Sequence, residues 1–329
     1  MNNISLFAGI LLVFFISPFL ATIVILCLAF YHRRSEKLLY VAVGLLVLIN
    51  ITVDWQETDY RWYLPLFKSA LHIPFHTYIW SLSSAKEPVY TIITFILSYV
   101  FIGSSTLFSI FSNFVFYFFM MAGLNVIRAS LNINRIYWAL AVCVLLFFPY
   151  IFANSANHVR QYWGTAIVFF SLVKYLIEKK KKYLALAATS VLIHTSSGLI
   201  LLLALIPFMG KKLTLRTSLY YLGAFVALLS LSSIAKFLFP FFGEGLMGHA
   251  LNKAIIGTTF ETEFTISKLL FAIIVVGVPY FVINVSQFSK HSGVMKLMNV
   301  QLMLVIMIAA NLKQEEFWRS SILPWMTTL

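Results

Sequence analysis

Long apolar runs separated by short polar stretches fill this chain from end to end. A run of about 20 apolar residues is long enough to cross the roughly 30 Å hydrocarbon core of a bilayer as a helix. The N-terminal run has no basic segment before it, so we expect a retained helix and not a cleaved signal. The predicted spans cover residues 4–30, 38–53, 105–127, 137–153, 161–177, 217–240, 266–287 and 295–311.

The composition agrees with this pattern. The chain is 61% hydrophobic and 11% charged, whereas soluble domains carry about 25% charged residues. We therefore predict an all-α, polytopic integral membrane protein, a single transmembrane domain over residues 1–329, with about 9–11 transmembrane or re-entrant helices. The net charge of +13 does not require nucleic acid, because basic cytoplasmic loops give a membrane protein the same sign.

Two basic stretches predict the orientation in the membrane. The loop "HRRSEK" at 32–37 and the run "EKKKK" at 178–182 are typical of cytoplasmic loops. With both inside, segment 54–88 becomes an outer loop, and segment 241–265 is also an outer loop if 183–208 does not cross the membrane. Residues 89–104 are then too short to cross, and we expect them to form a helix that dips into the outer leaflet.

The segment 183–208 allows two interpretations. It is long enough to cross once, but "HTSSG" interrupts its middle, which also suits a broken, re-entrant pair of helices. The short basic loop 209–216 favours the re-entrant pair, because short loops weigh most in the positive-inside rule. The sequence ends at "ILPWMTTL", part-way into a further apolar segment, so the C-terminal helix is expected to be incomplete.

Polar and ionisable residues gather on the predicted outer face, where they mark a functional site, since such groups are costly at membrane depth. Each also has a simpler interpretation. The carboxylates and aromatics of "DWQETDYRWY" at 54–63 could be a solvated loop with an interface belt. Glu87 could complement a helix dipole, Arg160 could snorkel, and His194 could be a core histidine bonded to Ser196 or Ser197.

The sequence lacks the motifs of several common enzyme classes. The chain contains no P-loop motif, no HExxH, no GxSxG and no Asp-x-Asp pair, and we therefore expect neither an ATPase nor a metal hydrolase. Cys27 and Cys143 both lie in apolar runs, so a disulfide is not expected. We predict no metal and no cofactor.

Four ordered motifs carry a resemblance to a known family. "TDYRWY", "EPVY", "VRQYWGTAI" and "KKKKYLALAATSVLIHTSSGLI" follow one another within roughly residues 38–206. In this order they resemble the EpsG-like family of polysaccharide polymerases, which are Wzy-type enzymes. The resemblance implies a glycosyltransferase similar to the GT-C class in the bacterial cytoplasmic (inner) membrane. It would join undecaprenyl-pyrophosphate-linked repeat units into O-antigen, capsule or exopolysaccharide on the outer face.

The resemblance also implies roles for individual residues. Asp59 is the expected base, with Glu87 or His194 as rivals, and Arg160 is the cation that holds the leaving pyrophosphate. Trp163 and Gly164 depart from the small apolar residues expected before Ala166. The implied catalytic residues are Asp59, Glu87, Arg160 and His194, and the implied substrate-binding residues are Tyr60, Tyr63, Gln161, Ser196 and Arg319.

Two other functions of the same pathway stay open at this stage. A membrane O-acyltransferase would use His194 as its base but would leave the outer carboxylates without a task. A flippase for lipid-linked oligosaccharide usually has more spans and two similar halves, and no such symmetry is visible. The expected partners are the lipid-linked oligosaccharides, membrane lipids and a chain-length regulator, with no nucleic acid.

Overall fold

Helices make up all the regular structure in the described part of the chain, as the sequence predicts. The computed structural model describes residues 3–31, 35–48, 60–82, 85, 87–147, 151, 155, 158–212, 214–229, 237–238, 240–241, 277 and 290–310. The chain divides into two compact units, residues 1–201 and 202–328. The sites discussed below lie in the first unit.

One described helix is long and apolar enough to cross a membrane, α7, which covers Ser105–Leu131 and matches the predicted span 105–127. Its 27 residues extend about 40 Å. Shorter helices occupy the places of five other predicted spans, and the span predicted at 266–287 lies outside the described residues except for position 277. These helices are α3 (Ser35–Leu48), α8 (Arg135–Phe147), α10 (Val159–Leu176), α13 (Leu215–Leu229) and α17 (Ser292–Ala310).

The single helix predicted over 4–30 is wrong, because α1 ends at Ile16 (Asn3–Ile16) and α2 begins at Pro18 (Pro18–Tyr31). Ser17 caps the second helix: its Oγ accepts a hydrogen bond from Leu20 N at 3.2 Å. Proline is favoured at the first helical position, where its missing N–H costs nothing. The residue before a proline avoids the helical region, and this local chemistry overrides the continuous apolar pattern.

The segment predicted as an outer loop, 54–88, contains helices in its described part. These are α4 (Tyr60–Ser69), the 3₁₀ turn η3 (Ala70–His72) and α5 (Phe75–Leu82). The short helix expected over 89–104 is α6, Pro88–Val100, with Glu87 at its N-cap. Its 13 residues extend only about 20 Å.

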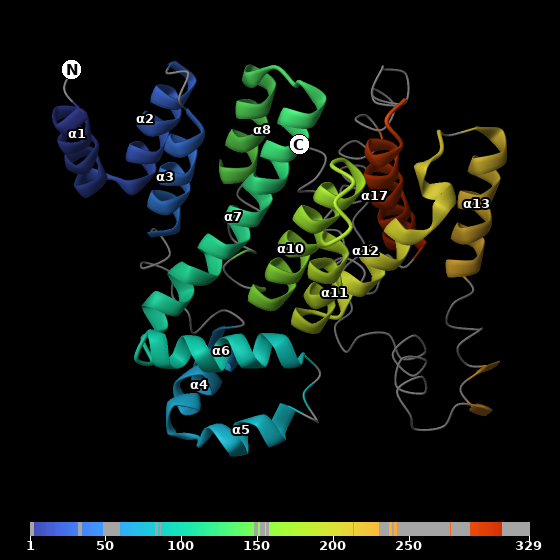
Figure 1. Ribbon diagram of the computed structural model, residues 1–329, viewed down its shortest axis with the longest axis horizontal. Coiled ribbons are helices and arrows are strands. Elements are labelled where there is room, and N and C mark those ends of the chain that lie inside the picture. Colours follow the sequence, from blue (N-terminus) through green and yellow to red (C-terminus); the bar gives the residue numbers. More distant parts are fainter. Residues whose placement is uncertain are drawn as a thin grey trace. The chain divides into compact units, whose positions relative to one another are not determined.

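Helix α10 is the centre of the first unit and packs against α7 and α11 (Tyr183–Ile193), with α11 beside it in Figure 1. Trp163 Nε1 of α10 donates a hydrogen bond to the carbonyl oxygen of Ser112 in α7 at 2.8 Å. Helix α11 runs antiparallel to α10: the ring of Tyr183 contacts that of Phe170 at 5.6 Å, and the far end of α11 reaches Gly164.

The lysine-rich turn between α10 and α11 is held by ion pairs. Glu178 accepts from Lys174 at 2.8 Å and from Lys180 at 2.5 Å. Burial alone would raise the pKa of Glu178, but these hydrogen bonds and charges outweigh it and hold the pKa below its usual value. The carboxylate therefore stays ionised at neutral pH and fixes the turn, in which Lys179 adopts a left-handed conformation with φ of 60°.

The predicted break in 183–208 is confirmed. Helix α11 ends at Ile193, and α12 begins at Ser196 (Ser196–Leu205). Between them His194 is extended, with φ of −153° and ψ of 124°. A Cβ placed on Gly198 would lie 3.2 Å from Val191 Cγ1, so the first turn of α12 packs against the last turn of α11. Whether the pair re-enters the membrane stays a prediction.

The second unit is described in fewer residues. Its 3₁₀ turn η4 (Pro207–Gly210) packs on α17, which also contacts α13. The amide nitrogen of Asn299 in α17 donates to the carbonyl oxygens of Met209 at 2.5 Å and Lys211 at 2.8 Å. This buried amide fixes the first residues of the basic loop 209–216.

Candidate functional site

Glu87 is the centre of a cluster of polar and ionisable side chains brought together from four segments of the first unit, Tyr63, Glu87, Arg160 and His194. Its side chain is 3% exposed, and its two carboxylate oxygens have different partners. Oε2 accepts from Arg160 Nη1 at 2.5 Å, and Oε1 lies 2.5 Å from His194 Nδ1. A buried carboxylate requires such partners, because removal from water is otherwise very costly.

The helix-dipole interpretation of Glu87 does not account for this arrangement. Glu87 is the N-cap residue of α6, yet its side chain makes no capping hydrogen bond. Its carbonyl oxygen begins the helix by accepting from Thr91 N at 3.1 Å. The backbone of Glu87 thus starts α6 while its carboxylate is directed to Arg160 and His194.

Arg160 lies in the first turn of α10 and is 34% exposed. Besides its bond to Glu87, it donates to the Tyr63 hydroxyl from Nε at 3.2 Å and from Nη2 at 3.0 Å. The guanidinium carbon also lies over two aromatic rings. It is 4.8 Å from the ring centre of Tyr63 and 5.8 Å from that of Tyr90. Its place is thus fixed by one acid and two aromatic residues rather than by snorkelling alone.

These contacts leave hydrogen-bonding capacity on Arg160. An arginine carries five N–H donors, and the bonds to Glu87 and Tyr63 use three of them. Within the described ranges no protein group takes the remaining two. Arginine prefers the paired oxygens of phosphates and carboxylates, so this side chain is suited to bind an anion while it remains anchored.

His194 contributes a second exposed group. Its side chain is 21% exposed, and the described residues offer no hydrogen-bond partner to Nε2. Nδ1 is held by Glu87, which fixes the orientation of the ring. The alternative of a core histidine bonded to Ser196 or Ser197 does not apply to the ring, because the contact with Ser197 is a backbone bond from Ser197 N to His194 O at 3.0 Å.

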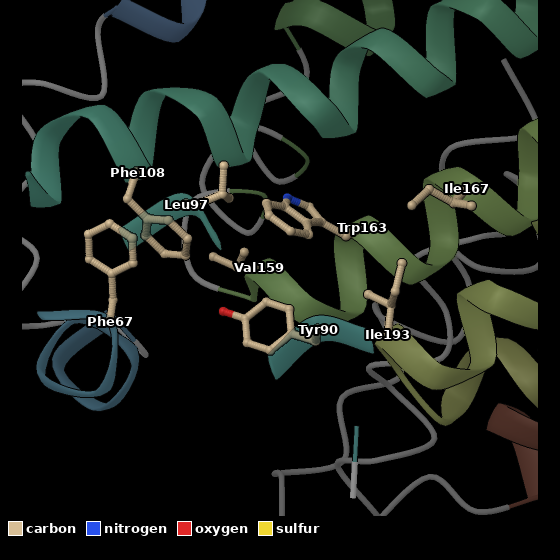
Figure 2. Close-up of a cluster of buried hydrophobic side chains, with 8 residues drawn as sticks. All are labelled: Phe67, Tyr90, Leu97, Phe108, Val159, Trp163, Ile167 and Ile193. Carbon is tan, nitrogen blue, oxygen red and sulfur yellow. The ribbon is translucent and has the colours of Figure 1, made fainter. Parts of the chain in front are cut away.

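A hydrophobic core of aromatic and aliphatic side chains packs next to these groups. Figure 2 shows its eight buried side chains, which come from α4, α6, α7, α10 and α11. Phe67 stacks on Phe108 with ring centres 4.5 Å apart, and Tyr90 meets Trp163 edge to face at 5.7 Å. The members are Phe67, Tyr90, Leu97, Phe108, Val159, Trp163, Ile167 and Ile193.

Gly164 allows the closest approach of α10 to the His194 turn. A Cβ at this position would lie 2.5 Å from Ser197 Oγ and 3.0 Å from His194 Cβ, which is closer than such atoms can come without displacement. The glycine that departs from the expected small apolar pattern is therefore required by the packing of the site.

A comparison with known protein families matches residues 37–329 to the EpsG family. The chain belongs to the EpsG family. The match extends well beyond the motifs at 38–206 that carry the resemblance in the sequence. Neither a curated protein nor a solved structure matches the chain.

Membership of the EpsG family indicates a polysaccharide polymerase-type function associated with a membrane. In this EpsG-family chain, three of the four residues expected to be catalytic lie together: Glu87, Arg160 and His194. Tyr63 joins them through Arg160. Whether these residues act in catalysis stays a prediction.

Of the five other expected site residues, the structure describes the side chains of two, Gln161 and Ser196. Asp59 and Arg319 lie outside the described residues, and of Tyr60 only the backbone is described, at the start of α4. Gln161 is 6% exposed in α10, and Ser196 begins α12. The roles of Gln161 and Ser196 stay predictions.

Sequence reasoning missed Tyr90 and Gly164. Tyr90 follows Glu87 by three residues in "EPVY", a spacing that places both on one face when a helix starts at the intervening proline. That spacing was the available signal. The structure describes no group of three His, Cys, Asp or Glu side chains close enough to hold a metal ion.

Proposed function

We propose that this EpsG-family protein is an oligosaccharide repeat-unit polymerase. The donor is a growing chain on undecaprenyl pyrophosphate, and the acceptor is a hydroxyl of a new lipid-linked unit. In the reaction the acceptor oxygen bonds to the anomeric carbon while the bond from that carbon to the pyrophosphate oxygen breaks. The observation that carries the proposal is the Glu87 carboxylate, which holds a cation and an imidazole together, each partly exposed.

Arg160 is the group proposed to stabilise the leaving pyrophosphate. Negative charge develops on the leaving oxygen as the glycosidic bond breaks, and a fixed cation at that place lowers the barrier. The two N–H donors of Arg160 that no described residue occupies suit two phosphate oxygens. Tyr63 and Glu87 hold the guanidinium in place, so little reorganisation is needed when the charge appears.

His194 is proposed to take the proton of the acceptor hydroxyl at Nε2. Its Nδ1 faces the Glu87 carboxylate, which orients the ring and stabilises the imidazolium that forms. Glu87 itself is a poor base in this arrangement, because both oxygens are engaged and the side chain is buried. The sequence also favours Asp59 as the base, and Asp59→Asn compared with His194→Gln separates these assignments.

The location of the cluster along α10 supports an outer-face reaction. Arg160 lies at one end of this helix and Lys179–Lys182 follow its other end. From Arg160 to Leu176 the helix advances 16 positions, or about 24 Å, most of the thickness of the hydrocarbon core. With the lysines on the cytoplasmic side, the cluster is on the outer-leaflet side.

The test is the profile of lipid-linked saccharides in cells that carry only Arg160→Ala at a matched protein level. Loss of polymer with single lipid-linked units on the outer leaflet supports the polymerase. Units retained on the inner leaflet would indicate a flippase, and normal chain lengths with altered acylation would indicate an acyltransferase. Arg216→Ala is the matched control, since Arg216 also begins a helix and donates to a tyrosine, Tyr220, but is exposed.

A further inference from the structure

Helix α4, in the segment 54–88 that was expected to be an outer loop, has a buried face, an exposed apolar face and a basic face. Along α4 and into η3, residues Tyr63, Phe67 and Ala70 share one face, and Phe67 and Ala70 are buried. A second face carries Trp62, 64% exposed, and Leu66, 67% exposed. The third face carries the basic side chains of Arg61 and Lys68, both exposed. The three faces follow from the helical repeat of 3.6 residues.

Helix α5 continues this character. Phe75 is 62% exposed and Trp80 is 78% exposed, while His76 lies exposed between them. From residue 60 to residue 82 the sequence contains no aspartate or glutamate. A surface that combines exposed tryptophans with basic side chains and lacks acids is complementary to an anionic lipid surface.

Neither helix can cross a bilayer. Helix α4 has ten residues and α5 has eight, which extend only about 15 Å and 12 Å. Their buried sides are attached to the rest of the unit: Tyr78 donates to the carbonyl oxygen of Thr91 at 2.7 Å, and Phe67 stacks on Phe108. The exposed apolar side chains therefore keep facing outward.

The contacts with α7 place this segment at one end of the membrane-length helix. Phe108, the partner of Phe67, lies in the first turn of α7. Leu71 of η3 lies against Gly103, just before that helix begins. If α7 crosses the bilayer, its first turn is at the lipid–water boundary, and α4 and η3 lie at the same level.

We propose that α4, η3 and α5 form an interfacial element that lies flat on the outer face of the cytoplasmic membrane. Trp62, Leu66 and Trp80 enter the acyl boundary, and Arg61 and Lys68 bind the phosphates of anionic phospholipids. Tyr63, on the same short helix, contacts Arg160. The element thus sets the charged cluster at the depth of lipid phosphates, where a lipid-linked pyrophosphate would also lie.

The test measures depth and involves no turnover, so it is independent of the proposed reaction. The full chain with Cys27→Ala and Cys143→Ala carries a nitroxide on Trp62→Cys or Trp80→Cys, in bilayers that contain phosphatidylglycerol. Collision with oxygen is compared with collision with an aqueous nickel chelate. Phe118→Cys on α7, 40% exposed, serves as the deep reference, and Lys181→Cys in the lysine turn serves as the aqueous reference.

We expect both labels at an intermediate depth between these references. Exchange of Arg61 and Lys68 for glutamate should move them toward water, whereas Arg216→Glu should leave them unchanged. Labels as accessible to nickel as Lys181→Cys would show a solvated loop and overturn the proposal. Labels protected from both reagents would show a protein covering this face, which would also overturn it. If the depth of the labels does not change when Arg61 and Lys68 are exchanged for glutamate, these residues do not bind anionic phospholipids, and that part of the proposal is wrong.

Discussion

At the residue scale, Arg160 has two interpretations that one substitution separates. A lysine carries the same charge but cannot fork across two phosphate oxygens or between Glu87 and Tyr63. We expect Arg160→Ala to lower the rate roughly 10²–10³-fold, as loss of one transition-state donor does. Arg160→Lys should restore only part of this, and mainly kcat should change. The measurement is the polymer ladder at membrane protein levels matched by blot.

The opposite outcome is equally informative. If Arg160 acts only by reaching the membrane surface, Lys should replace it fully, and Ala should lower protein abundance rather than turnover. Full-length ladders from Arg160→Ala at matched levels would remove Arg160 from the mechanism.

Tyr63 offers a milder change at the same site. Tyr63→Phe removes the hydroxyl that accepts two hydrogen bonds from Arg160 but keeps the ring over which the guanidinium lies. A hydrogen bond to a charged group contributes about 1.5–3 kcal/mol, and the remaining Glu87 contact should retain part of the orientation. We expect about a tenfold loss of rate, which Tyr63→Ala should exceed. Equal ladders from Tyr63→Phe and the unchanged protein would show that the hydroxyl does not position Arg160.

The ionisable residues of this site could be predicted from the sequence, but their pairing could not. Glu87, Arg160 and His194 each stand out as ionisable groups beside apolar runs. Glu87 and Arg160 are 73 positions apart, and Glu87 and His194 are 107 apart. No local pattern links groups so distant, because their contact depends on how α6, α10 and α11 pack.

At the element scale, Gly164 determines how closely α10 approaches the His194 turn. Gly164→Ala places a methyl group against Ser197 Oγ and His194 Cβ. Overpacking of this kind costs about 1–3 kcal/mol, more than the roughly 0.5–1 kcal/mol that alanine gains in a helix. We expect a lower unfolding temperature in detergent and a weaker polymer ladder. The matched control is Gly223→Ala in α13, which has open space around it and should be neutral or stabilising. A Gly164→Ala protein as stable and active as the control would contradict this packing argument.

The elements themselves were predicted unevenly. The break at His194 was visible because "HTSSG" interrupts an apolar run. The break at Ser17 and Pro18 has an equally clear capping signal, but it was hidden by apolar residues on both sides. Helices α4 and α5 were expected only as a loop, since the acidic and aromatic stretch at 54–63 suggested a solvated rim. Their helical faces become evident only when Phe67 and Ala70 are known to be buried.

At the scale of the whole molecule, the path of the chain after α11 decides which groups can share the proposed outer site. Helices α11 and α12 have 11 and ten residues, so each covers only about half of the roughly 30 Å core. The contact between Gly198 and Val191 favours a chain that turns back at His194. The basic loop 209–216 then returns to the cytoplasmic side, in agreement with the positive-inside rule.

The two possible paths of segment 183–208 differ in the positions that a membrane-impermeant thiol reagent can reach. In the background Cys27→Ala and Cys143→Ala, Lys68→Cys should react in intact cells, because α4 is expected outside. Lys181→Cys should react only after the inner face is opened. Since both ends of a re-entrant pair lie on one side, Lys212→Cys should behave like Lys181→Cys. If Lys212→Cys instead reacts in intact cells, the segment 183–208 crosses once. The orientation of every later helix would then reverse, and Arg319 could not contribute to the outer site.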